Sequence, residues 1–145
     1  DTISFQSRVI VGDTEHHTPE LSSVIECFTL YPYWYVPRKI SVEEYLPILQ
    51  RDRSFITRNN FDVLNRNGAV LSPDSIPWHT FHKDYFPVSL RQREGTENSL
   101  GLVKFIFDNP YAVYLHDTNA KRSFSYRVRA LSHGCVRVER AMDLA

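Results

Sequence analysis

The run Ser132-His133-Gly134-Cys135 lies near the C-terminal end of the sequence, with Arg137 close behind it and His116 nineteen residues before Cys135. A cysteine attacks as its thiolate, so at neutral pH it needs a base that removes the thiol proton. Two imidazoles close to one thiol could supply that base and orient it. Gly134 has no side chain, which would let backbone N–H groups face a developing oxyanion. These residue types and spacings predict nucleophilic catalysis by Cys135 with a histidine as its base.

The other histidines and the second cysteine have simpler interpretations. His16-His17 are adjacent, so their side chains would diverge in a strand, and we expect a solvated loop. His79 and His82 would share a helix face, but no cysteine or second pair accompanies them, so we predict no metal site. We interpret Cys27 as a small buried apolar residue rather than a disulfide partner.

The segments next to the reactive residues are predicted to be strands. Residues 102–107 and 111–115 are apolar and rich in β-formers, and they predict a strand pair that ends at His116. A rigid sheet could then aim the His116 ring while a loop keeps it accessible. Residues 136–138 predict a short strand, so Cys135 would lie where a loop meets regular structure.

Residues 20–90 are interpreted as a mixed insertion of one helix and a small hairpin. Ser41 begins a capping-box pattern and should be the N-cap of the helix, which Pro47 should kink or restart. Asn67-Gly68 between two apolar runs predicts the β-hairpin. Residues 85–90 can form a further strand.

The remaining segments complete the expected fold. Residues 2–11 alternate loosely and predict a strand that leads into a turn at Gly12, and residues 139–145 predict the start of a helix. Residues 31–37 are dense in aromatic side chains, and their prolines keep them extended and out of a central sheet position. Trp34 in this segment belongs either to a packed aromatic corner or to one wall of a ligand groove.

Composition limits the classes of protein that this chain can belong to. At 145 residues, with 42% hydrophobic residues, it fits one domain with a sizeable core. Seventeen basic and seventeen acidic residues give a formal net charge of zero, so there is no basic excess to attract nucleic acid. No apolar run approaches the ~20 residues that a bilayer span needs. No phosphate-binding glycine loop or zinc-finger spacing is present in the sequence.

With these motifs the chain resembles the L,D-transpeptidase catalytic domain family (YkuD-type). The family signature is a histidine, a spacer, Ser/Thr-His-Gly-Cys, an apolar residue and then Asn or Arg. This sequence fills every position of the signature, with His116, the spacer 117–131, Ser132-His133-Gly134-Cys135, Val136 and Arg137. The resemblance spans about residues 9–145. Further segments resemble the larger, capped branch of the family: Tyr114 to Thr118, Arg129 to Leu131, Trp34 with Val36-Pro37, Arg91-Gln92, and Asn98 to Gly101 followed by Lys104-Phe105.

The resemblance implies an α+β fold, mainly β with some α, in which a mixed β-sheet or β-sandwich core carries a small helix-plus-hairpin insertion. Residues 1–145 would form the catalytic domain, partial at both ends, and about 20–90 would be the insertion that caps the active-site groove.

The resemblance also implies roles for individual residues. Cys135 would be the nucleophile and His116 the general base, with the backbone around Asp117 holding the far ring nitrogen of His116. If Asp117 used its carboxylate instead, His116 would be more basic, and the sequence leaves this open. His133 would order the nucleophile loop, and the N–H groups of Gly134 and Cys135 would form the oxyanion hole. The residues expected to contact substrate are Tyr114, Asp117, Ser132, Arg137 and Trp34.

The implied substrate is a peptidoglycan stem tetrapeptide. Cys135 would attack the carbonyl of its diamino acid, release D-alanine, and pass the acyl group from a thioester to the amine of a neighbouring acceptor stem. No metal, nucleotide or redox cofactor is needed, a carbapenem-type β-lactam is the expected covalent inhibitor, and the expected location is the periplasm or cell envelope. Nucleic acid and a membrane span within this segment are not expected. Two alternatives remain open: a cysteine hydrolase of wall peptides and a non-catalytic wall-binding module.

Overall fold

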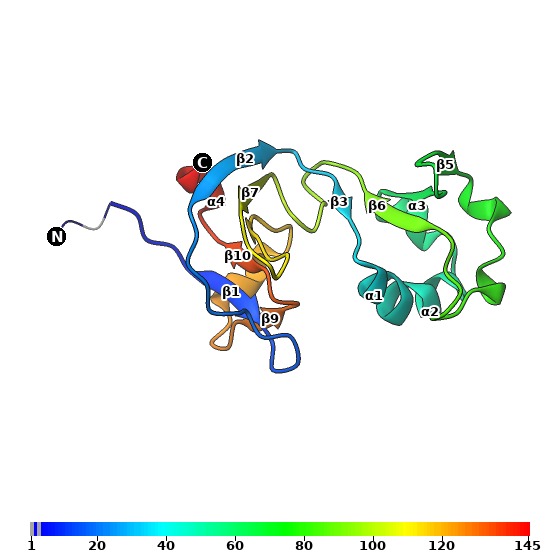
Figure 1. The fold of residues 1–145 in the computed structure, drawn as a ribbon, viewed down its shortest axis with the longest axis horizontal. Coiled ribbons are helices and arrows are strands. Elements are labelled where there is room, and N and C mark those ends of the chain that lie inside the picture. Colours follow the sequence, from blue (N-terminus) through cyan, green and yellow to red (C-terminus); the bar gives the residue numbers. More distant parts are fainter. Residues whose placement is uncertain (1, 3) are drawn as a thin grey trace. The chain divides into compact units, whose positions relative to one another are not determined.

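The computed structural model describes residue 2 and residues 4–145, and its strands and short helices confirm the α+β fold class. The chain forms two compact units (Figure 1), one made of residues 1–32 and 94–145 and the other of residues 33–93. In the part of the chain that the structure describes, no helix is long and apolar enough to cross a membrane.

The first unit is built on a mixed six-stranded sheet in the order β2-β7-β8-β10-β1-β9. Its elements are β1 (Val9–Gly12), β2 (Ile25–Leu30), β7 (Val103–Phe107), β8 (Leu115–His116), η4 (Lys121–Ser125), β9 (Ala130–Ser132), β10 (Val136–Val138) and α4 (Ala141–Leu144). The predicted pair is present as antiparallel β7 and β8, and β8 ends at His116 as expected. The second strand of the pair is shorter than the run 111–115 suggested.

Alternation along β7 explains which face of this sheet is the core. Val103 and Phe105 are fully buried, whereas Lys104 between them faces the other way. Val138 and Ala141 pack with the two buried β7 residues into one apolar cluster. The polar residues of β7 and β8 are therefore left on the opposite face, where the candidate site lies.

The second unit contains a four-stranded sheet in the order β3-β6-β4-β5 and several short helical segments. Its elements are β3 (Trp34–Tyr35), α1 (Arg38–Ile40), η1 (Ser41–Tyr45), α2 (Leu46–Leu49), α3 (Phe55–Arg58), β4 (Phe61–Leu64), β5 (Val70–Leu71), η2 (Pro73–Ser75), η3 (Trp78–Thr80) and β6 (Ser89–Gln92). The hairpin prediction is confirmed, because β4 and β5 pair antiparallel and Gly68 has a φ of 80°. The aromatic segment forms the edge strand β3, which agrees with its prolines.

The capping-box prediction for Ser41 is wrong. The helix begins at Arg38 directly after Pro37, and Ser41 is buried inside it with its Oγ donating to the Val36 carbonyl at 3.5 Å. The segment Ser41–Tyr45 is π-helical and precedes Pro47. Proline has no N–H and its ring crowds the carbonyl four residues earlier, so a wider turn before it relieves that clash without ending the helix.

Several other predicted elements differ from the structure in the residues at which they begin or end. The strand predicted over residues 2–11 is confined to β1, and Ile3 lies outside the described residues. The strand predicted at residues 85–90 begins at Ser89. Residues 25–30 pair with β7 in the first unit, so the second unit spans residues 33–93 instead of about 20–90. The prediction that Cys27 is buried is wrong: it is an exposed free thiol on the edge strand β2, all of whose side chains are exposed, so neither face of this strand is covered.

Candidate active site

Three adjacent strands place a lysine, a histidine and an arginine on one face of the six-stranded sheet. The β7–β8 register sets Lys104 opposite His116, and the β8–β10 register sets Arg137 opposite the same histidine. Residues directly opposite one another in a sheet share a face. The strand register therefore gathers two cations around the predicted base.

Cys135 reaches this sheet immediately before β10. The N–H of Val136 donates to the carbonyl of Tyr114 at 2.9 Å, and a backbone hydrogen bond from Tyr114 reaches the thiol of Cys135. Tyr114 directly precedes β8, two positions before His116. The parallel pairing of β8 and β10 thus brings the predicted nucleophile and the predicted base onto neighbouring segments of the sheet.

Ser132 holds the nucleophile loop from the inside. Its Oγ donates to the Cys135 carbonyl at 2.5 Å and accepts the N–H of Gly134 at 3.2 Å, while Gly134 has a φ of 108° that favours glycine. Ser132 is buried and its hydroxyl braces the loop, while its expected contact with substrate stays a prediction. The N–H of Gly134 is thus engaged with the Ser132 hydroxyl.

A second loop, residues 13–18, packs against the nucleophile loop. Thr18 Oγ1 donates to the Gly134 carbonyl and accepts the N–H of Gly12, both at 2.8 Å. The ring of His16 lies 4.8 Å from the ring of His133, which is itself exposed. The expectation of a merely solvated loop missed these contacts, and no local signal could have revealed them, because Thr18 and Gly134 are 116 residues apart.

His116 is buried, and its ring is held by one backbone contact. Nδ1 contacts the carbonyl oxygen of Asp117, as the sequence led us to expect. A carbonyl oxygen only accepts, so Nδ1 carries the proton and Nε2 is left as the basic nitrogen. This tautomer is the one that a general base requires.

The carboxylate of Asp117 makes several contacts within the protein. It is buried, accepts the N–H of Leu102 at 3.0 Å and pairs with the ammonium of Lys121. Gly101 lies directly against it, since a Cβ at Gly101 would come within 2.4 Å of the Asp117 Oδ2. The expected contact of Asp117 with substrate stays a prediction beside these contacts.

Burial and the two cations set the charge state of the site. Burial lowers the pKa of His116 to about 4, with Arg137 and Lys104 lowering it further against the opposing effect of Asp117. Burial raises the pKa of the Cys135 thiol, while the Tyr114 hydrogen bond and the charges of Lys104 and Arg137 lower it. At neutral pH the resting pair is therefore a neutral imidazole and a neutral thiol, not an ion pair.

The remaining candidates fall into two groups. Tyr114 is half-buried and lines a cavity of about 480 Å³ in the first unit together with Thr18, Val113 and Val136. Arg137 is half-buried, and its Nε has no hydrogen-bond partner within residue 2 and residues 4–145. Trp34 belongs to the second unit instead, where its ring contacts those of Tyr45 and Phe61, both at 6.3 Å between centroids.

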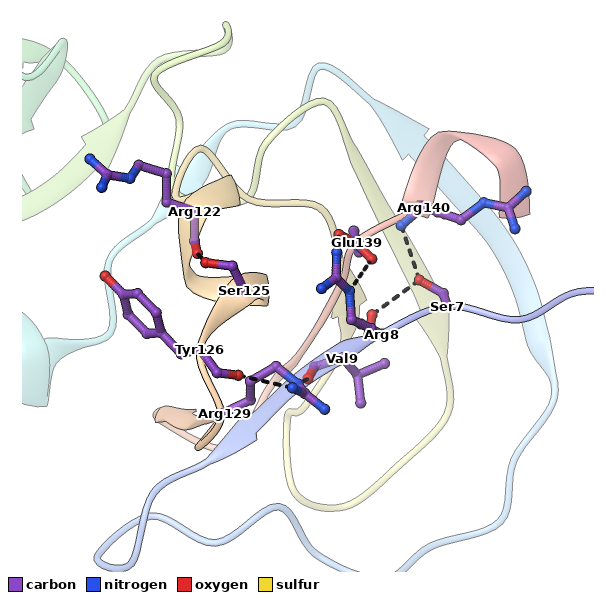
Figure 2. A network of polar contacts seen from close by, with 9 residues as sticks. All are labelled: Ser7, Arg8, Val9, Arg122, Ser125, Tyr126, Arg129, Glu139 and Arg140. Atoms are coloured by element: carbon purple, nitrogen blue, oxygen red, sulfur yellow. Dashed lines mark hydrogen bonds and ion pairs between the residues drawn. The ribbon is translucent and has the colours of Figure 1, made fainter.

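A polar network joins the segment before β1 to the segment after β10 (Figure 2). Arg8 Nε donates to Glu139 Oε2 at 2.8 Å, which joins the segment before β1 to the segment after β10. Ser7 Oγ donates to the Arg8 carbonyl and accepts the N–H of Arg140, both at 3.0 Å. These contacts are exposed and individually weak, but together they fix the antiparallel pair that carries the chain out of the nucleophile loop.

Comparison with known proteins agrees with this geometry. Residues 1–145 match the sequence model of the YkuD family, described as the L,D-transpeptidase catalytic domain. The chain is also similar to a protein of Haemophilus influenzae named "Putative L,D-transpeptidase", with 39% identity over 140 residues that cover 97% of this chain and 28% of that protein. The chain thus spans less than a third of the length of this relative. It belongs to the L,D-transpeptidase catalytic domain family.

Proposed function

We propose that this chain is the catalytic domain of a peptidoglycan L,D-transpeptidase in which Cys135 is the nucleophile and His116 the general base. The observation that carries the proposal is the pairing of β10 with β8, which sets the Cys135 loop beside the strand that ends at His116. Family membership supplies the reaction class, and the Nδ1 contact to Asp117 supports Nε2 of His116 as the base.

In the first half-reaction, Cys135 Sγ attacks the carbonyl carbon of the diamino acid in a donor tetrapeptide, and Nε2 of His116 takes the thiol proton. The intermediate collapses by breaking the C–N bond to D-alanine, whose nitrogen receives that proton from His116. Because burial disfavours the imidazolium, the proton is held only briefly and is readily given to the leaving amine. The product is a thioester on Cys135 and free D-alanine.

In the second half-reaction, the side-chain amine of a diamino acid on a neighbouring stem attacks the thioester carbon. His116 accepts a proton from the attacking nitrogen and returns it to the sulfur as the C–S bond breaks. The N–H of Cys135 is the proposed donor to the oxyanion in both halves. Exclusion of water favours transfer over hydrolysis, and we propose that the second unit serves this purpose as a cap.

The cavity beside Tyr114 supports a binding site for one stem. Its walls are mostly aliphatic and aromatic, and Val136 connects them to the nucleophile loop. The guanidinium of Arg137 is suited to a carboxylate of the donor, since its fork matches carboxylate geometry. We also propose an extracytoplasmic location and acylation of Cys135 by a carbapenem-type β-lactam.

The decisive experiment incubates the full-length protein with purified disaccharide-tetrapeptide and detects products by mass. We expect cross-linked dimers together with free D-alanine, and neither product from the Cys135→Ala variant. Release of D-alanine without dimers would assign the protein to the hydrolases. Binding without any product would assign it to the wall-binding modules.

A further inference from the structure

Lys104 is a half-buried cation on the strand next to the predicted base. It stands opposite His116 in the β7–β8 register. Its Nζ lies 3.6 Å from the centroid of the Tyr114 ring, within the range of a cation–π contact. The ring therefore fixes the ammonium in place on the face of the sheet that carries the site.

Tyr114 also connects this ammonium to the nucleophile. Its carbonyl oxygen accepts the N–H of Val136, the residue after Cys135, at 2.9 Å, while its ring holds Lys104. The charges of the two groups act on each other, since Lys104 lowers the pKa of Cys135 and Cys135 raises that of Lys104. Within residue 2 and residues 4–145, no carboxylate forms an ion pair with Lys104. Its positive charge is therefore not neutralised by the protein itself.

The other charged groups around the thiol do not replace Lys104. His116 is neutral at working pH, because burial lowers its pKa to about 4, so it cannot provide a resting positive charge. Arg137 acts on the thiol from β10, and its buried Nε makes it costly to reorient. Other titratable groups of the neighbouring elements include the Asp117–Lys121 pair next to His116. On the two packed loops they are Asp13, Glu15, His16, His17 and His133.

We propose that Lys104 is a positioning residue of the reaction, whose ammonium, held on the ring of Tyr114, stabilises the thiolate of Cys135 as His116 removes its proton. This inference rests on the proposed role of Cys135 as nucleophile. The thiol proton goes to Nε2 of His116, the negative charge stays on sulfur next to the ammonium, and Lys104 neither gives nor takes a proton. The histidine of the motif then serves as proton carrier, and the lysine supplies the counter-charge that a buried neutral histidine lacks.

The test measures ionisation of the thiol without any wall substrate. Iodoacetamide, a neutral reagent, is reacted with the full-length protein from pH 6 to 10, and alkylation of the peptide that contains Cys135 is followed by mass. The variants are Lys104→Met and Lys104→Gln, which remove the charge, and Lys104→Arg, which keeps it. Lys83→Met in the second unit, whose side chain is exposed, is the matched control. Thermal melting of every variant verifies that it is folded.

We expect removal of the charge to raise the thiol pKa and to slow alkylation near pH 7 by about three- to tenfold, since one pKa unit is a factor of ten in thiolate. The rates should converge at high pH, Lys104→Arg should stay within about twofold of the parent, and Lys83→Met should be unchanged. Identical pH profiles for the parent and both neutral variants would overturn the inference. So would a Lys104→Arg variant as slow as Lys104→Met, because this result assigns the lysine a packing role.

The outcome is separable from that of the proposed function. A shifted pH profile in a protein that makes no dimers and releases no D-alanine would support the role of Lys104 at the thiol and refute the transpeptidase. An unshifted profile in a protein that makes dimers would refute the role of Lys104 and leave the transpeptidase intact.

Discussion

The hydroxyl of Ser132 donates to the carbonyl oxygen of Cys135 at 2.5 Å, so a buried side chain three residues before the nucleophile fixes the direction of its backbone. The Ser132 Oγ also accepts the N–H of Gly134 at 3.2 Å. Ser132 is therefore part of the frame that holds the nucleophile loop.

Replacement of Ser132 by alanine should damage both stability and activity. It leaves the Gly134 N–H and the Cys135 carbonyl without their partner inside the loop, and an unsatisfied buried polar group costs about 1–3 kcal/mol. Urea unfolding should show a loss of this size, and release of D-alanine should fall because the thiol is no longer aimed. Ser132→Thr keeps the hydroxyl and should retain most of both. Full activity in the alanine variant would show that the loop holds its shape without this bond.

Acid should destabilise the protein through His116. Its pKa is about 4 in the folded state and about 6.5 in an unfolded chain, so between these values the unfolded state binds more protons. The stabilising contribution is complete above pH 6.5 and is lost as the pH falls towards 4. Between pH 7 and pH 5 the free energy of unfolding should drop by about 2 kcal/mol from this group. The measurement is urea unfolding at both pH values, and in His116→Gln the drop should be smaller by that amount.

Local signals in the sequence accounted for the elements whose shape depends on their own residues. The apolar runs on either side of Asn67-Gly68 gave a correct hairpin, because a turn that needs positive φ is encoded by the residues in it. The strand end at His116 was equally local, since β-formers stop there and polar residues follow. The contact of His116 with the Asp117 backbone was implied by the family resemblance, whereas the sequence alone left the Asp117 carboxylate open as the alternative.

The features that the sequence could not predict depend on contacts between distant segments. Ser41 has the pattern of an N-cap, but its small side chain fits a buried position one turn inside a helix that starts after Pro37. The placement of Lys104 opposite His116 appears only when β7 and β8 are in register. Thr18 gave no signal because its partner Gly134 lies in the other packed loop.

Thr18→Val should loosen the nucleophile loop while keeping the shape of the side chain. The change removes the acceptor for the Gly12 N–H and the donor to the Gly134 carbonyl. The loop backbone lies close against Gly12, since a Cβ there would lie 2.0 Å from the His16 carbonyl oxygen. We expect about a tenfold fall in kcat, corresponding to about 1.4 kcal/mol of transition-state stabilisation. Steady-state assays of dimer formation check it, with Thr18→Ser as the variant that should behave like the parent.

A carbapenem should form one covalent adduct, located on Cys135. The exposed thiol of Cys27 is an internal control, because reagents that attack any accessible thiol would label it as well. Intact-mass spectra of the full-length protein should show the adduct in the parent and in Cys27→Ser, and no adduct in Cys135→Ala. Labelling that persists without Cys135 would show that the reaction does not report on this site.

Trp34→Ala tests the two interpretations of the aromatic segment. The ring contacts Tyr45 and Phe61 in the second unit, so its loss should lower the free energy of unfolding by about 3 kcal/mol, as for other large aromatic truncations. Trp34→Phe should recover most of this stability, and Tyr35→Ala, at an exposed neighbour, should have little effect on it. If Trp34 also lines the groove, the stable Trp34→Phe variant should have a higher KM for the tetrapeptide. The reason is that the smaller ring contacts less of the ligand. A stable Trp34→Phe variant with unchanged KM would restrict this tryptophan to the core of the second unit.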